Sequence, residues 1–214
     1  MSESENKYEK GNEELLTMFK GKSIDRDAAE RIVAGIADLN RPILDLYGYS
    51  TTYLYEAETY NNIDAVRFLL EHGADPNLCR LDLTNDCPLY DLHFLWEEMV
   101  DDAKSRLDIA KLFFEYGADP DLWYEFETLY DHVMWEVFND WLTPHDWSYI
   151  SRFFLILIAY GGGNGESYHK KANLSEPIDR NRIDEYELKL FKCEDGYHLE
   201  GHLFNPEGMD IGTV

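Results

Sequence analysis

Basic residues are scarce in this chain of 214 residues, which has 19 Lys and Arg against 43 Asp and Glu and a formal net charge of −24. Direct nucleic-acid binding is disfavoured, because a phosphate backbone needs a positive face. An acidic surface instead attracts a basic protein and speeds the encounter. The alternative, that the charge serves solubility alone as in many bacterial and halophilic proteins, stays open, although about −2 to −8 is enough for a small domain.

Cysteines and long apolar runs are also few. Cys79, Cys87 and Cys193 are too sparse and too widely spaced for a disulfide scaffold, and such usage fits a reducing cytosol. The longest apolar run, Phe153–Tyr160, is too short to cross a membrane. The N-terminal stretch Met1–Glu14 is polar and lacks the apolar centre of a signal peptide. We therefore expect a cytoplasmic protein that does not contact a membrane.

Recognisable catalytic and metal-binding motifs are missing from the sequence. It has no phosphate-binding loop, no nucleophile elbow and no Cys and His at a recognisable spacing. On a strand, His198 and His202 would lie about 13 Å apart at about 3.3 Å per residue, too far for one metal ion. Asp82, Thr84 and Asp86 alternate like the start of a calcium loop, but the required Gly and closing Glu are missing. We expect no catalysis, no cofactor and no metal.

The sequence does contain a repeated amphipathic helix. In Asn62–Asn77 (NIDAVRFLLEHGADPN) the apolar residues recur at i, i+3 and i+4, which predicts a helix packed on one side. Similar stretches are Arg106–Asp121 (RLDIAKLFFEYGADPD) and Ser151–Gly165 (SRFFLILIAYGGGNG). Each is closed by a glycine where left-handed backbone is expected. These glycines are Gly73, Gly117 and Gly161, spaced 44 residues apart. A fixed period of this size indicates a stacked repeat array.

A second repeated piece precedes each of these helices and carries a family resemblance. It reads TYLYEA from Thr52, CPLYDL from Cys87 and ETLYDH from Glu127. From Thr52 to Asn77 the chain resembles the ankyrin repeat, whose pattern is T-P-L-H-x-A followed by a helix that closes on G-A-D-P-N. The resemblance implies a divergent ankyrin-repeat protein of bacterial or phage type. The chain departs from the family in having Tyr for the motif His, at Tyr55, Tyr90 and Tyr130, which we interpret as scaffold residues.

The later repeats are longer than the first. The spacing from the motif Leu to the closing Gly grows from 19 residues in the first repeat to 28 and then 32. The sequence allows either insertions between the two helices or longer inner helices. We interpret Leu89–Ala103 and Leu129–Leu142 as long inner helices.

We predict an all-α solenoid of about three ankyrin-like repeats with a cap at each end. Residues 1–12 are expected to be a disordered tail, and 13–50 a helical N-terminal cap. Residues 51–165 form the repeats, and 166–214 a linker followed by a C-terminal β-hairpin. The hairpin is predicted because Tyr186–Cys193 and Tyr197–Phe204 alternate in polarity around the turn signal Asp195-Gly196. The segment after Pro206 is expected to be irregular.

The candidate binding residues come from the resemblance, from acidic residues and from an aromatic loop. The family's variable binding positions correspond to Thr59, Tyr60, Asp86, Phe94, Glu125, Phe126, Met134 and Trp135. The acidic group is Glu97, Glu98, Asp101 and Asp102, and the aromatic loop adds Trp123 and Tyr124. Trp and Tyr are favoured anchors of interfaces. Two structural interpretations stay open: the acids form a solvated helix face, and the aromatics cover the end of the preceding inner helix.

Taken together, these features predict a monomeric, non-catalytic protein-binding module. We expect an acidic inhibitor or immunity-type protein that binds a basic partner, such as a nuclease toxin or a nucleic-acid-binding enzyme. One alternative is a general adaptor for a neutral partner. The other is an enzyme that uses the C-terminal segment containing His169, His198 and His202.

Overall fold

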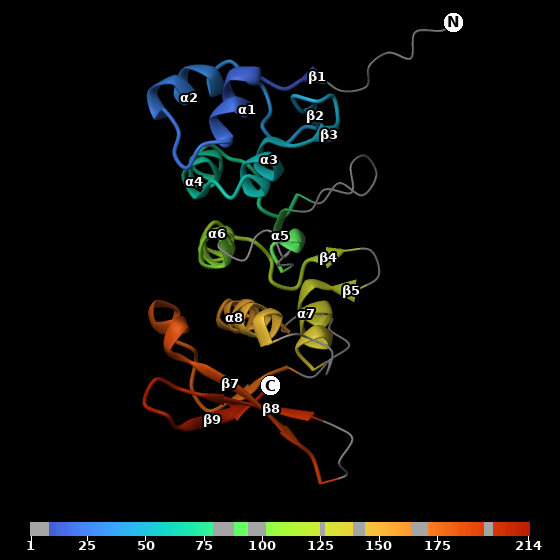
Figure 1. The fold of residues 1–214 in the computed structure, drawn as a ribbon, viewed down its shortest axis with the longest axis vertical. Helices are drawn as coiled ribbons and strands as arrows, with labels where there is room; N and C mark the ends of the chain where they lie inside the picture. The colour runs from blue at the N-terminus through green and yellow to red at the C-terminus, as the bar shows by residue number, and fades with distance from the viewer. Residues whose placement is uncertain are drawn as a thin grey trace, which may run out of the picture. The chain divides into compact units, whose positions relative to one another are not determined.

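The computed structural model describes residues 9–78, 88–93, 102–124, 127–138, 144–163, 171–194 and 199–214. The chain divides into two compact units (Figure 1). Unit 1 comprises Met1–Leu92 and Asp101–Ala118, and unit 2 comprises His93–Val100 and Asp119–Val214. Each unit is described by itself below.

Unit 1 is built mainly from short helices whose starts are fixed by side-chain caps. In chain order they are α1 (Glu13–Phe19), α2 (Arg26–Val33), α3 (Tyr53–Thr59), α4 (Ile63–Glu71), α5 (Pro88–Asp91) and α6 (Ala103–Glu115). The first four are preceded by a polar residue whose side chain accepts a hydrogen bond from the backbone amide three residues later. These caps are Asn12, Asp25, Thr52 and Asn62. The predicted helical repeat at Asn62–Asn77 therefore begins where the sequence indicated.

A small sheet precedes α3 and corrects two predictions. Strand β2 (Ile43–Leu44) pairs antiparallel with β3 (Ser50–Thr51), and β1 (Glu9–Lys10) joins β2 in parallel. We call the segment from β2 to β3 the first finger. Because β1 is paired and Asn12 caps α1, the expectation of a disordered tail is wrong for residues 9–12, while residues 1–8 lie outside the described part. The predicted all-α solenoid with a C-terminal hairpin is confirmed only in part, because unit 1 contains this small sheet beside its helices.

The glycines that set the repeat period all have left-handed backbone. Gly73, Gly117 and Gly161 have φ angles of 88°, 90° and 100°, as predicted from their position after each outer helix. In the turn between α3 and α4, Asn61 also has a positive φ, of 51°. Asparagine tolerates this conformation better than most residues.

The core of unit 1 holds one buried ion pair. Glu58 at the end of α3 and Arg106 on α6 are both buried, and their Oε1 and Nη1 atoms lie 2.9 Å apart. Arg106 also donates a hydrogen bond of 2.8 Å from Nη2 to the backbone carbonyl of Asp91. Arg106 therefore connects α3, α5 and α6 through polar contacts in an otherwise apolar core.

Unit 2 repeats the order of finger, inner helix and outer helix. Strands β4 (Trp123–Tyr124) and β5 (Glu127–Thr128) pair antiparallel and form the second finger. Inner helix α7 (Leu129–Val137) begins immediately after β5, with Thr128 as its cap. Outer helix α8 (Pro144–Ala159) packs against α7. Proline suits the first position of α8, since its missing N–H is not needed there.

Both predicted long inner helices are shorter in the structure. Helix α5 ends at Asp91, and Leu92 and His93 form a turn, so a continuous helix over Leu89–Ala103 is wrong. Helix α7 ends at Val137, where we had expected it to continue to Leu142, although residues 139–143 lie outside the described part. Within the described residues, the extra length of these repeats does not extend either inner helix.

The glycine run at the end of α8 makes room for a buried tyrosine. A Cβ atom on Gly162 or Gly163 would lie 2.8 Å from the ring of Tyr130, which is fully buried. The backbone amide of Gly163 donates a hydrogen bond of 2.6 Å to Asp121. This packing supports the interpretation of Tyr130 as a scaffold residue. It also adds a reason for glycine at positions that the sequence marked only as a helix stop.

The C-terminal segment is a four-stranded antiparallel sheet in the order β6-β9-β8-β7. Strands β7 (Glu187–Lys192) and β8 (Leu199–Phe204) form the predicted hairpin. Two elements were not predicted: β6 (Asn173–Leu174) lies in the expected linker, and β9 (Asp210–Thr213) lies in the segment expected to be irregular. Strand β6 pairs with β9, and β9 pairs with β8 of the hairpin, so the C-terminal piece is a small sheet rather than a lone hairpin.

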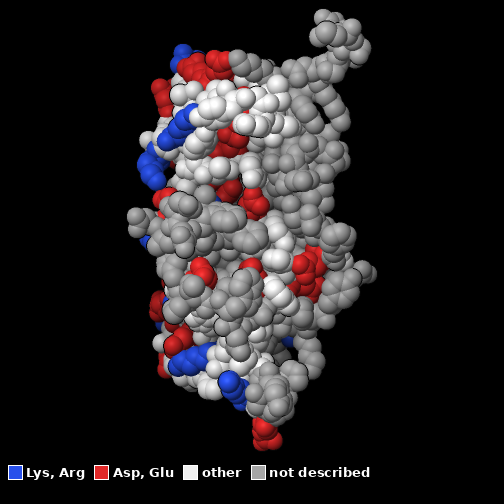
Figure 2. Space-filling view, turned by 45° about the vertical axis from the view of Figure 1, so that its right-hand side comes forward, with Lys and Arg blue, Asp and Glu red and all other residues white. Residues whose placement is uncertain are grey.

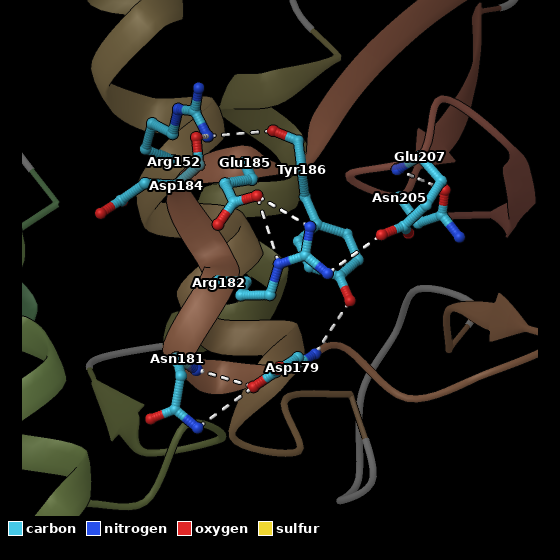
Figure 3. Close-up of polar contacts among 9 residues, drawn as sticks. All are labelled: Arg152, Asp179, Asn181, Arg182, Asp184, Glu185, Tyr186, Asn205 and Glu207. Atoms are coloured by element: carbon cyan, nitrogen blue, oxygen red, sulfur yellow. Dashed lines mark hydrogen bonds and ion pairs between the residues drawn. The ribbon is translucent and has the colours of Figure 1, made fainter.

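Arg152 of helix α8 forms several hydrogen bonds with this segment. Arg152 donates hydrogen bonds to the backbone carbonyls of Asp184 and Tyr186 (Figure 3) and to that of Ile183, at the end of the 3₁₀ helix η2 (Arg180–Glu185). Arg182 of the same helix forms ion pairs with Glu185 and with Glu207. These contacts, together with packing of α8 on η2, place the C-terminal segment on the last helix pair of unit 2.

Within the described ranges, no helix has both the length and the apolar character needed to cross a bilayer.

Candidate functional site

Exposed aromatic side chains distinguish the first finger. Tyr47 and Tyr49 lie between β2 and β3, and they are 71% and 73% exposed. The Asp45 carboxylate accepts hydrogen bonds from both backbone amides, and Gly48 has a φ of 87°. The tyrosines are therefore held in a defined turn, although their rings extend into solvent.

The end of inner helix α3 lies beside this finger. Thr59 is exposed and Tyr60 is half-buried, so a partner can reach both side chains from solvent. The Lys20 ammonium lies 5.2 Å from the centre of the Tyr47 ring and 5.7 Å from that of Tyr60, within the range of cation–π contact. Its hydrogen bond to the Tyr47 hydroxyl raises the pKa of Lys20, so this part of unit 1 carries a positive charge.

The second finger and α7 present two tryptophans. Trp123 on β4 is 47% exposed and Trp135 on α7 is 52% exposed. The more accessible residues of α7 are His132, Trp135 and Glu136, which have the i, i+3 and i+4 spacing of one helix face. An exposed aromatic ring flanked by polar groups is the composition of an interface anchor.

Acidic groups accompany this helix face. Glu127 on β5 lies 2.6 Å from Nδ1 of His132, and Glu136 lies 3.8 Å from its Nε2. Burial raises the pKa of the Glu136 carboxyl, and His132 opposes the shift. The face therefore combines a large apolar ring with carboxylates.

The remaining predicted site residues fall into three groups. Met134 is buried in α7, so its side chain offers little surface to a partner. Asp102 precedes α6 and forms an ion pair with Lys22 at 3.4 Å. The side chain of Tyr124 lies outside the described part, as do the whole residues Asp86, Phe94, Glu97, Glu98, Asp101, Glu125 and Phe126.

Charge on the visible face is mixed. Figure 2 shows Asp and Glu side chains scattered among uncharged residues, with Lys and Arg between them, rather than gathered in one patch of the described surface. On the described part of this face, the acidic side chains are therefore not gathered into a single patch.

Sequence reasoning missed Tyr47 and Tyr49. The available signal was the sequence DLYGYS, in which two tyrosines flank a glycine, the residue favoured in tight turns. We had assigned this segment to the helical N-terminal cap, residues 13–50. The two-residue strands that make it a finger are too short to give a periodic pattern.

The comparisons with known proteins identify one segment. The family model described as Ankyrin repeat matches residues 51–80, which contain the first full repeat inferred from the sequence. None of the curated proteins matches the chain. The matched segment begins at Thr51, the last residue of β3, and includes α3 and α4.

Proposed function

We propose that this chain, which is an ankyrin-repeat protein, binds another protein without catalysing a reaction, through aromatic side chains on its fingers and inner helices. Ankyrin repeats are protein-interaction modules, and repeat arrays present their fingers and inner helices as a binding surface. The observation that carries the proposal is the exposure of Tyr47, Tyr49, Trp123 and Trp135 on these elements.

The exposed area of these aromatic rings does not contribute to the hydrophobic stabilisation of the fold. Their apolar area contributes to stability only when it is removed from water, at about 25 cal/mol per Å². Trp and Tyr are also the residue types most often found as energetic anchors of protein interfaces. A partner that covers the rings would gain this free energy on binding.

The partner we propose is basic. The chain carries −24 at neutral pH, and Glu127 and Glu136 accompany Trp135 in unit 2. A basic protein would be attracted over a Debye length of about 8–10 Å at physiological salt. We therefore infer a monomeric, cytoplasmic inhibitor or immunity-type protein that occupies a basic surface, such as that of a nuclease toxin or a nucleic-acid-binding enzyme.

A neutral partner is the second candidate, and Lys20 is the observation that favours it. This ammonium lies beside Tyr47 and Tyr60, so a cation accompanies the aromatic rings at this part of unit 1. An adaptor for a neutral protein would use the rings of both fingers and would depend little on the net charge. An enzyme centred on the C-terminal histidines has less support, since His169 and His198 lie outside the described residues and His202 contacts Asp210 and Glu200.

The test compares finger variants with exposed aromatic controls. Immobilised wild-type chain, Tyr47→Ala/Tyr49→Ala and Trp123→Ala/Trp135→Ala capture proteins from the native cell extract. The matched controls are Tyr116→Ala, which removes an exposed ring next to outer helix α6, and Phe191→Ala, which removes one from β7. Bound proteins are eluted with a salt gradient and identified by mass spectrometry, and their affinity is then measured with purified partner.

A basic protein that elutes at moderate salt, and binds at least ten-fold more weakly to a finger variant, supports the proposal. A partner retained at high salt but lost in the same variants supports the neutral-partner adaptor. Equal binding to the finger variants and the controls would refute the finger surface.

A further inference from the structure

Two histidines and a carboxylate from separate segments of unit 2 converge on one point. His93 follows α5 in the chain, while His132 and Glu136 lie one turn apart on α7. One nitrogen or oxygen atom from each lies within 4.8 Å of the other two. The side chain of His93 is 0% exposed, Glu136 is 14% exposed and His132 is 20% exposed. The cluster is thus largely shielded from water.

The hydrogen bond to Glu127 determines the tautomer of His132. An ionised carboxylate only accepts hydrogen bonds, so the 2.6 Å contact between Glu127 Oε1 and His132 Nδ1 requires a proton on Nδ1. In the neutral imidazole, Nε2 then carries a lone pair. This Nε2 atom lies 3.8 Å from Glu136 Oε1, which is longer than a hydrogen bond.

The remaining contacts extend this arrangement to a third group. His93 Nε2 lies 3.8 Å from Glu136 Oε2, and the two imidazole rings meet edge to face with centroids 4.8 Å apart. A separation of 3.8 Å is longer than the donor–acceptor distance of a hydrogen bond, but it is close to the distance between two ligand atoms bound to the same metal ion. Ligands at about 2.0–2.2 Å from a tetrahedral zinc ion lie roughly 3.4 Å from each other.

We propose that His93, His132 and Glu136 bind a zinc ion, and that Glu127 orients His132 as a ligand. Two imidazoles and one carboxylate form a donor set that suits Zn²⁺, whereas Mg²⁺ and Ca²⁺ prefer oxygen ligands alone. A carboxylate that accepts the other N–H of a metal-binding histidine is the usual support of such a ligand. Small side-chain rotations close the remaining separation, and a water molecule completes four-fold coordination.

The chain offers a matched comparison on its surface. His202 also lies between two carboxylates, with Nδ1 2.7 Å from Asp210 and Nε2 3.3 Å from Glu200. Both of its nitrogens are within hydrogen-bond distance of carboxylates, and it provides a single imidazole. His202 therefore has the composition of an ordinary surface ion pair, whereas the buried cluster brings two imidazoles to one carboxylate.

The experiment measures zinc binding to the full chain, purified without a histidine tag and treated with a chelator. Zinc chloride is titrated by isothermal calorimetry, and cobalt(II) is used in parallel because its visible absorption reports coordination geometry. The variants are Glu136→Gln, which keeps the side-chain shape, His93→Gln and Glu127→Gln. His202→Gln is the control. Far-UV circular dichroism without metal verifies that each variant folds.

We expect one zinc ion per wild-type chain and four-coordinate cobalt. Glu127→Gln should weaken zinc binding about 10–100-fold, Glu136→Gln should weaken it further, and His202→Gln should leave it unchanged. If His93→Gln fails to fold, Glu136→Gln and Glu127→Gln still decide the result. The proposal is overturned if the wild type binds no zinc, if a folded Glu136→Gln binds with wild-type affinity, or if His202→Gln removes the binding.

Discussion

The buried Glu58–Arg106 pair predicts an unusual pH dependence of stability. Removal from water raises the pKa of the Glu58 carboxyl from 4.5 to about 7, and the nearby Asp91 carboxylate adds to the shift, while Arg106 opposes it. Because the pKa is higher in the folded chain, the folded state binds the proton more tightly than the unfolded state. The stabilisation is fully present below about pH 4.5 and is lost as the pH rises through about 7.

The magnitude follows from the shift. At 1.36 kcal/mol per pKa unit, the free energy of unfolding should fall by about 2–3 kcal/mol from pH 5 to pH 8 through this group alone. Glu58→Gln removes the titration but keeps the shape of the side chain. At pH 5 the free energy of unfolding of the variant should be close to that of the wild type, because Glu58 is neutral in the folded wild type at this pH. At pH 8 it should be more stable than the wild type by about 2–3 kcal/mol, because it contains no buried carboxylate.

Urea unfolding at pH 5, 6, 7 and 8 measures this difference, followed by far-UV circular dichroism. Tryptophan fluorescence is a second probe that reports the unfolding of unit 2, because all five tryptophans belong to the sequence ranges of that unit. Glu58 lies in unit 1, so the two probes together show whether the two units unfold at the same urea concentration. Groups distant from Glu58 titrate equally in both proteins, so the difference between the two curves reports Glu58 together with its neighbour Asp91.

A variant that is less stable than the wild type at pH 8 would also have a clear physical cause. If the ion pair with Arg106 dominates, Glu58 stays ionised and Glu58→Gln leaves a buried arginine without its counter-charge. The variant would then be destabilised by about 3–5 kcal/mol at pH 8. That result, or a difference between the two proteins that does not change with pH, would refute the reasoning from burial.

Two further predictions concern packing. Leu69→Ala should lower the free energy of unfolding by about 2–5 kcal/mol, since Leu69 is fully buried in α4 and truncation leaves a cavity. Urea unfolding followed by circular dichroism measures this loss. A midpoint equal to that of the wild type would contradict the repeat alignment. Gly117→Ala should cost about 1–2 kcal/mol from left-handed backbone alone, because a Cβ there meets nothing within 4 Å. Gly163→Ala should add about 1–3 kcal/mol of overpacking, because its Cβ meets the Tyr130 ring; equal losses in thermal unfolding of the two variants would argue against that contact.

Features fixed by local chemistry were predictable from the sequence. The left-handed glycines Gly73, Gly117 and Gly161 were identified because the repeated helix must end at each of them, and all three have positive φ. The outer helix α4 was predicted for the same reason, because its apolar spacing and its closing glycine lie within one short window. The family match over residues 51–80 falls on this segment.

Features that depend on distant partners were not predictable. Strand β1 exists because Glu9 pairs with Ile43, and two-residue strands have no readable period. The apolar pattern continues past the true ends of α5 and α7, so it overestimated both helices. The cluster at His93 was missed because His132 lies 39 residues further on, and the sequence search compared only closely spaced histidines.

The candidate binding surface was only partly accessible to sequence reasoning. Trp123 and Trp135 were selected from residue type and repeat position, and both side chains are exposed. Met134 was selected by the same rule, but it is one residue away from the exposed helix face and is buried. The register of a helix relative to its neighbours decides which of two adjacent residues reaches solvent, and the repeat pattern alone did not resolve it.

The strand order of the C-terminal sheet has a consequence for folding during synthesis. Strand β6 pairs only with β9 among the described strands, and Asn173 is aligned with Thr213, 40 residues later in the chain. At about 5–20 residues per second, a ribosome needs roughly 2–8 seconds to make the intervening segment. During that interval the helices of unit 2 are already synthesised, while β6 lacks its partner. The sheet therefore closes last, after the helix pair on which it rests.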